Sequence, residues 1–185
     1  GTFFALNRGP GISGAVAAGL AYSAAFFTKQ VALAPALAVG AYYLVRERKQ
    51  FFAYILMLVV VAGGGTLLLN RYYGGWYLYY VFLLSSRHSL HLAQLNEFIF
   101  RDLLRVFPVL FGISLYVCID TLKTRRTYKE APAGLLFVLL SASLFVVSFV
   151  GRGNVNSYIN TLLPVTLAFS LLSGWIWGRQ LSPIP

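Results

Sequence analysis

The chain has 185 residues, of which 58% are hydrophobic and only 11% are charged, and its formal net charge at pH 7 is +10. A soluble domain usually carries about 25% charged residues, so the apolar excess must largely face lipid, which excludes an ordinary soluble globular domain. The fifteen Lys and Arg residues lie in short gaps between apolar stretches, where anionic headgroups attract them. This distribution argues against nucleic-acid binding.

Six apolar stretches follow one another, at residues 12–27, 31–45, 51–69, 106–122, 132–150 and 159–177. The last four have 17 to 19 residues, which suits helices that cross a hydrocarbon core about 30 Å thick. The first two are shorter, and Thr28-Lys29-Gln30 separates them, so they form either two short spans or one interrupted helix. Pro35 weakens the helix just after this tripeptide and favours two spans. We therefore expect an all-α, polytopic transmembrane helix bundle of about six spans.

Two short basic segments, at residues 46–49 and 123–129, set the expected orientation. Short loops rich in Lys and Arg stay in the cytoplasm, and an even number of predicted crossings separates the two. Residues 70–105 and 151–158 are then expected outside, with both ends of the chain in the cytoplasm. The start at Gly1 rather than Met suggests either a processed chain or a piece of a longer one, and we favour the expectation that this single transmembrane domain, residues 1–185, belongs to a longer chain.

The predicted outer segment 70–105 begins with seven aromatic residues within positions 72–82. Such a cluster is typical of an interfacial aromatic belt, and this interpretation is favoured over a platform on which a sugar or lipid headgroup stacks. Further along, apolar residues recur every three to four positions, at Leu92, Leu95, Phe98 or Ile99, and Leu103. This spacing predicts an amphipathic helix along the outer membrane surface.

Three groups of residues occur in a recognisable order. They are Gly19-Leu20-Ala21-Tyr22 running to Phe27-Thr28-Lys29-Gln30, then Gly74-Gly75-Trp76-Tyr77-Leu78-Tyr79-Tyr80-Val81-Phe82 with His88 downstream, and finally Gly151-Arg152-Gly153-Asn154 before Tyr158-Ile159-Asn160 and Leu163-Pro164. In this order they resemble the C-terminal half of the transmembrane region of GT-C glycosyltransferases of type 39, which are similar to protein O-mannosyltransferases. The resemblance covers most of residues 12–177.

The resemblance implies transfer of a sugar from a polyprenyl-phosphate donor on the outer face of a bacterial plasma membrane. It implies that Lys29 and Arg152 contact the donor phosphate, and that Trp76 and Tyr77 line the sugar or lipid path. Arg152 and Asn154 lie in a polar outer turn suited to charge-assisted hydrogen bonds. The alternatives are that Lys29 snorkels to the headgroups and that the turn is an ordinary capped loop.

No catalytic base is evident, although the family places its catalytic acids in its first outer loop. The five acidic residues are Glu47, Glu97, Asp102, Asp120 and Glu130. The expected orientation puts only Glu97 and Asp102 outside, on the amphipathic helix. His88 and His91 are three residues apart and form a weak candidate for a divalent metal site, because a third ligand is not evident.

The rival hypothesis is a non-catalytic transmembrane subunit of a larger complex, for example an energy-converting or photosynthetic one. A transporter is less favoured, because few ionisable residues lie within the apolar stretches. The expected partners are membrane lipids, a polyprenyl-phosphate sugar and other membrane subunits, but not nucleic acid.

Overall fold

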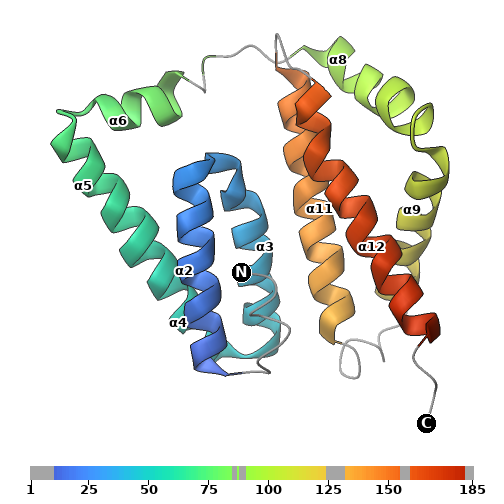
Figure 1. The fold of residues 1–185 in the computed structure, drawn as a ribbon, viewed down its shortest axis with the longest axis horizontal. Coiled ribbons are helices and arrows are strands. Elements are labelled where there is room, and N and C mark those ends of the chain that lie inside the picture. Colours follow the sequence, from blue (N-terminus) through green and yellow to red (C-terminus); the bar gives the residue numbers. More distant parts are fainter. Residues whose placement is uncertain (1–10, 85–86, 88–90, 124–131, 155–158, 182–185) are drawn as a thin grey trace. The chain divides into compact units, whose positions relative to one another are not determined.

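A computed structural model describes residues 11–84, 87, 91–123, 132–154 and 159–181, and every regular element in these ranges is a helix (Figure 1). Helical structure covers the six apolar stretches except residues 106 and 107, which precede a helix that begins at Pro108, and this confirms the predicted all-α class. The chain divides into two units, residues 1–88 and 89–185. The division falls inside the predicted outer segment 70–105, where the sequence gives no sign of a domain boundary.

Three helices of the described residues are long and apolar enough to cross a membrane, namely Arg48–Tyr72, Ala133–Gly153 and Asn160–Gly178. A fourth span is available if the bent pair Ala93–Leu104 and Pro108–Thr121 is one crossing. Helices Ile12–Thr28 and Gln30–Arg46 are apolar but shorter. The described residues are thus compatible with a multi-pass membrane protein, in which three of the six predicted spans, 51–69, 132–150 and 159–177, have a helix of sufficient length and 106–122 has one only as part of the bent pair.

Unit 1 consists of a helical hairpin, one long helix and a short helical segment that follows it (Figure 1). Its elements in chain order are α2 (Ile12–Thr28), the 3-10 turn η1 (Gln30–Ala32), α3 (Leu33–Arg46), α4 (Arg48–Met57), the π-helical η2 (Leu58–Gly63), α5 (Gly64–Tyr72), α6 (Trp76–Leu78) and the π-helical η3 (Tyr79–Leu83). The α2–α3 hairpin is joined to the long helix, Arg48–Tyr72, by the basic turn at residues 46–49.

Small residues let α2 approach the long helix closely. A Cβ atom added to Gly19 would lie 2.8 Å from Cβ of Met57, and one added to Gly65 would lie 2.5 Å from Cζ of Phe27. In both contacts the residue on the long helix follows its partner by 38 positions. The two helices therefore run parallel in one register, and the last residue of α2, Thr28, is level with the long helix six residues before its end.

Tyr54 joins the long helix to both arms of the hairpin. Its side chain has no exposed surface, and its hydroxyl donates a hydrogen bond to the carbonyl oxygen of Ala36 on α3, at 2.8 Å. The ring centroid is 6.5 Å from that of Tyr22 on α2 and 5.5 Å from that of Tyr43 on α3. A single buried side chain thus fixes the place of the hairpin against α4.

The chain turns sharply after the long helix at two glycines. Gly74 and Gly75 have φ values of +59° and +93°, a left-handed conformation that glycine adopts without steric cost. The N–H of Gly75 donates to the carbonyl oxygen of Asn70 at 2.7 Å, and the N–H of Leu78 donates to the Asn70 side-chain oxygen at 3.1 Å. These bonds fix how the aromatic segment, residues 76–83, leaves the long helix.

Unit 2 is built around two long apolar helices, α11 and α12, which pack along one another (Figure 1). Its elements are α8 (Leu92–Glu97), the π-helical η4 (Phe98–Leu104), α9 (Pro108–Lys123), α11 (Pro132–Gly153), the 3-10 turn η5 (Ile159–Leu162) and α12 (Leu163–Leu181). The chain bends by 99° between η4 and α9.

The predicted amphipathic helix is present as α8 and η4, but its apolar face contacts protein. Phe98 and Leu103 are completely buried in a core that includes residues of α12. The Phe98 ring lies 5.6 Å from that of Phe145 and 5.7 Å from that of Phe149, both on α11. Lipid contact by this face, which the sequence predicts, is therefore replaced at Phe98 and Leu103 by packing within unit 2.

Candidate functional site

Unit 1 contains an apolar pocket of about 560 Å³, bordered by the α2–α3 hairpin, the long helix and the aromatic segment. This volume lies in the range of small-molecule sites. Among its lining side chains only Tyr22 and Thr66 carry a polar group. Leu37 and Leu67, which also line it, are exposed, so the pocket opens on the apolar outer surface of the unit.

The wall that the long helix contributes includes backbone as well as side chains. The π-helical η2 supplies Leu58, Val59, Ala62 and Gly63 to the lining. A Cβ atom added to Gly63 would meet nothing within 4 Å. A Cβ atom can therefore be added at this pocket-lining position without a clash.

The aromatic segment closes one side of the pocket. Phe82 of η3 stacks on Phe26 near the end of α2, with ring centroids 6.3 Å apart and an angle of 28° between the ring planes. Both rings line the pocket, as does Leu78. The glycine turn and the Asn70 hydrogen bonds thus place an aromatic wall against the tip of the hairpin.

Lys29 lies at the tip of the hairpin, between α2 and η1, and is exposed. Its backbone N–H donates to the carbonyl oxygen of Ala25 at 2.9 Å, and its backbone carbonyl oxygen accepts from the N–H of Ala32 at 3.0 Å. Phe26 and Leu33, which flank it in the chain, both line the pocket. Lys29 itself does not line the pocket, but it lies in the turn between these two lining residues.

Trp76 forms an exposed aromatic cluster with its neighbours. Its ring stacks on that of Tyr80, with centroids 5.8 Å apart and planes at 30°, and meets Tyr79 edge-on at 5.5 Å. The guanidinium of Arg87 lies 6.0 Å from the centroid of the Tyr79 ring, within range of a cation–π interaction. Tyr77 is only partly exposed. The sequence points to Trp76 and Tyr77, whereas Leu78 and Phe82 are the residues of this segment that line the pocket.

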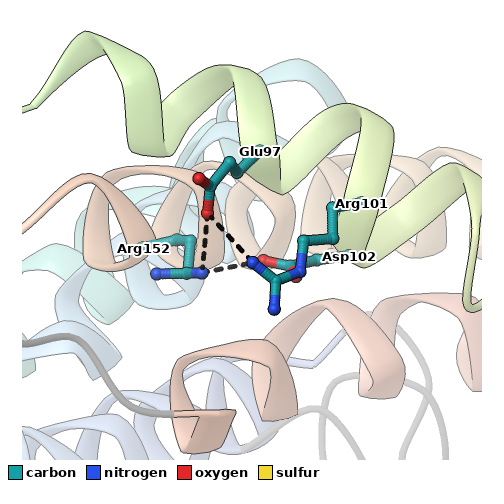
Figure 2. Close-up of polar contacts among 4 residues, drawn as sticks. All are labelled: Glu97, Arg101, Asp102 and Arg152. Atoms are coloured by element: carbon teal, nitrogen blue, oxygen red, sulfur yellow. Dashed lines mark hydrogen bonds and ion pairs between the residues drawn. The ribbon is translucent and has the colours of Figure 1, made fainter.

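Unit 2 contains a cluster of charged side chains, Glu97, Arg101, Asp102 and Arg152, shown in Figure 2. Nε of Arg152, on α11, donates to Oδ2 of Asp102 at 2.8 Å, and Nη2 of Arg152 lies 3.6 Å from Oε2 of Glu97. Arg101 approaches the same Glu97 oxygen at 3.6 Å. The Arg152 and Asp102 side chains are only 17% and 13% exposed, whereas Arg101 is 66% exposed. The Arg152–Asp102 pair is thus the sheltered centre of the cluster.

The π-helical geometry of η4 explains why two acids reach one arginine. Glu97 and Asp102 are five residues apart, a spacing that does not share a face of an α-helix. In a π-helix the repeating hydrogen bond joins residues i and i+5, so residues five apart lie one turn apart. Both carboxylates therefore face Arg152. The 3.6-residue period of an α-helix does not predict this arrangement.

The same helix also caps the end of α11. The N–H of His91 donates to the carbonyl oxygen of Gly153 at 2.9 Å. With its nitrogen turned toward α11, the Gln94 amide donates to the carbonyl oxygens of Arg152, Gly153 and Asn154 at 3.2, 3.3 and 3.0 Å. The last carbonyls of a helix have no partner within the helix, so these bonds fasten α8 to α11.

The residues predicted from sequence are divided between the two units. Lys29, Trp76 and Tyr77 belong to unit 1, and Arg152 and Asn154 belong to unit 2. Arg152 already binds two carboxylates, which favours a role in holding unit 2 together over contact with a phosphate.

Of the proposed metal ligands, His88 lies outside the described residues. Within the described ranges, no group of three or more His, Cys, Asp or Glu residues is arranged to hold a metal ion.

Comparisons of this chain with protein-family models, with curated proteins and with solved structures found no match. Function is therefore inferred from the pocket of unit 1.

Replacing Asp102 by asparagine should loosen α8 and η4 from the end of α11. The change leaves the sheltered Arg152 without its closest anion, and a lost hydrogen bond to a charged group costs about 1.5–3 kcal/mol. Amide hydrogen exchange should become faster at His91 and along α8. The control is Arg101→Ala, whose exposed ion pair should contribute under about 1 kcal/mol. Equal protection of His91 in both variants would show that Asp102 does not hold the helix.

Proposed function

We propose that the chain is part of a membrane glycosyltransferase that uses a polyprenyl-phosphate-linked sugar donor on the outer face of a bacterial plasma membrane. The observation that carries the proposal is the apolar pocket at the α2–α3 hairpin, whose lining includes Phe26 and Leu33 on either side of Lys29 in the chain. A polyprenyl-phosphate donor combines an apolar chain with an anionic group. In this proposal the pocket binds the chain and Lys29 binds the anionic group. The predicted orientation puts this end of unit 1 outside.

The affinity for such a donor has to come from fit and from charge. Lipid tails solvate an apolar chain as well as an apolar pocket does, so burial by itself gives little gain within a bilayer. Close contact in the pocket and a hydrogen bond from the Lys29 ammonium to phosphate would supply the difference, the latter about 1.5–3 kcal/mol. The exposed rings of Trp76 and Tyr80 offer flat faces for the sugar beside this site.

The proposal assigns donor binding to the described residues, not the acid–base step. Glu97 and Asp102, the acids predicted to lie outside, both contact Arg152. The guanidinium already occupies one oxygen of each carboxylate, Oδ2 of Asp102 and Oε2 of Glu97. The base is therefore expected elsewhere in the enzyme. The same pairing favours the alternative of a non-catalytic transmembrane subunit, for which no donor binding is expected.

The test is donor binding by protein in lipid nanodiscs, with the pocket filled by mutation. Gly63→Phe should place a ring in the pocket and lower the affinity for a polyprenyl-phosphate sugar at least tenfold, the equivalent of about 1.4 kcal/mol. Gly64→Phe is the matched control. It adds the same ring to the same helix at a position that also has nothing within 4 Å of its Cβ but does not line the pocket.

The cation is tested in the same assay. Lys29→Met should lower donor affinity ten- to a hundredfold, as expected for a lost charged hydrogen bond. Lys29→Arg should retain part of the binding, because the charge persists while the geometry changes. Equal binding by the Gly63 and Gly64 variants would remove the pocket from the donor site. Absence of binding by the unaltered protein would favour the non-catalytic subunit.

A further inference from the structure

We infer that the α2–α3 hairpin is re-entrant: it enters the bilayer from the end with the basic turn 46–49 and turns back inside the opposite leaflet. Its tip, residues 28–30, then holds Lys29 below the headgroup level, where it meets the phosphate of a lipid drawn into the membrane. The depth of the tip is argued from geometry alone. The identity of the ligand as a phosphate-bearing lipid rests on the proposed function.

Helix length gives the first measure of depth. At 1.5 Å per residue, the 17 residues of α2 extend about 25 Å. The hydrocarbon core of a bilayer is about 30 Å thick, so a helix that starts at one boundary of the core ends about 5 Å before the other. The long helix Arg48–Tyr72 has 25 residues and extends about 37 Å, enough to cross the whole core.

The register between the two helices gives a second, independent measure. The Gly19–Met57 and Phe27–Gly65 contacts both relate residues 38 positions apart. Continued by two residues, this register places Lys29 level with Leu67. The long helix runs on for five more residues to Tyr72, which is about 8 Å along its axis. The tip of the hairpin therefore lies well short of the end of the long helix.

The end of the long helix carries the residues that mark a membrane interface. Arg71 lies in its last turn, and Tyr72, Tyr73 and Trp76 are exposed there. Aromatic and basic side chains of this kind rest at headgroup level. With that level assigned to residues 71–76, both measures put Lys29 several ångströms inside the leaflet.

A lysine at that depth needs an anion or a route to water, because a charge in hydrocarbon is costly. The apolar pocket supplies the means by which an anion reaches it. Phe26 and Leu33, on either side of Lys29, line the pocket, and its exposed leucines open toward lipid. A lipid can thus enter sideways with its chain in the pocket and its phosphate at Lys29. A free phosphate would have to leave water and cross apolar surface to reach the same place.

The depth is tested by nitroxide labels on single cysteines placed at Thr28 and at Tyr73 in nanodiscs, with the native Cys118 replaced by alanine. Power saturation with oxygen and a water-soluble nickel complex reports how deep each label lies. The label at Thr28 should lie about 5–10 Å deeper than the label at Tyr73. Equal depths would overturn the re-entrant hairpin, whatever the protein binds.

The ligand is tested separately with a polyprenyl phosphate incorporated in the nanodisc and with inorganic phosphate in the buffer. The lipid should bind, Lys29→Met should weaken its binding at least tenfold, and the Thr28 label should stay at the same depth in that variant. Millimolar inorganic phosphate should not compete. Competition by inorganic phosphate would overturn entry from the membrane. Lack of lipid binding, with the label still deep, would overturn the proposed function and leave the hairpin standing.

Discussion

Replacing Phe98 by alanine is expected to destabilise unit 2 by about 3 kcal/mol. The ring is completely buried and contacts Phe145 and Phe149 of α11. Truncating such a ring costs about 3–5 kcal/mol in cores that unfold into water. The lower end applies here, because lipid tails also solvate the ring after unfolding, which leaves the lost packing and the cavity as the main cost. The measurement is the midpoint of unfolding when purified protein in mixed micelles is titrated with dodecyl sulfate.

The control for Phe98 lies two residues further along the same helix. Phe100 is 69% exposed, so Phe100→Ala removes a ring of the same size that has little protein around it. Its effect should be under about 0.5 kcal/mol. If both variants unfolded at the same midpoint, α8 and η4 would not pack on α11 and would lie free at the membrane surface, as the amphipathic pattern by itself suggests.

Replacing Tyr54 by alanine is expected to detach the hairpin from the long helix, at a cost of about 3–4 kcal/mol. The variant loses ring contacts with Tyr22 and Tyr43 and the hydrogen bond to the carbonyl oxygen of Ala36. Because the hairpin supplies part of the pocket wall, donor binding should fall in parallel with stability. The same titration with dodecyl sulfate measures the loss of stability.

Two further variants divide that cost into its parts. Tyr54→Phe keeps the ring and removes only the hydroxyl, so it should lose about 0.5–1.5 kcal/mol, the usual net value of one hydrogen bond. Phe52→Ala truncates an exposed ring of the same helix and should have little effect. A loss from Tyr54→Phe as large as that from Tyr54→Ala would mean that the hydrogen bond, not ring packing, holds the hairpin.

The two clusters of the chain have different physical roles. Arg152 forms ion pairs with Glu97 and Asp102 and so joins α8 and η4 to α11. The role of this cluster is therefore to stabilise unit 2. The pocket of unit 1 is apolar space that the described residues leave unfilled, and Lys29 lies in the turn between two of its lining residues, Phe26 and Leu33. A satisfied ion pair stabilises its surroundings, whereas unfilled space is available to a ligand. The proposals on function therefore follow the pocket.

The apolar stretches in the sequence are sufficient to predict where most of the helices lie and that several are apolar enough to enter a membrane. Long apolar stretches form helices in lipid because each backbone N–H and C=O must find its partner within the segment. Charged and glycine-containing segments interrupt them, so 132–150 was predicted close to the observed α11, Pro132–Gly153. The position of Lys29 between two apolar helices was equally visible, because a charge in such a place is rare.

Which helix faces meet, and what space remains between them, follows from packing and cannot be predicted from the sequence pattern. Asp102 was predicted on the polar side of an α-helix, but the π-helical turn brings it beside Glu97 and onto Arg152. The pocket depends on the 38-residue offset between α2 and the long helix, which is set by Gly19 and Gly65 far apart in the chain. Periodicity reports one helix at a time. Register, helical pitch and unfilled volume arise from contacts between helices, so they became visible only when the helices were packed.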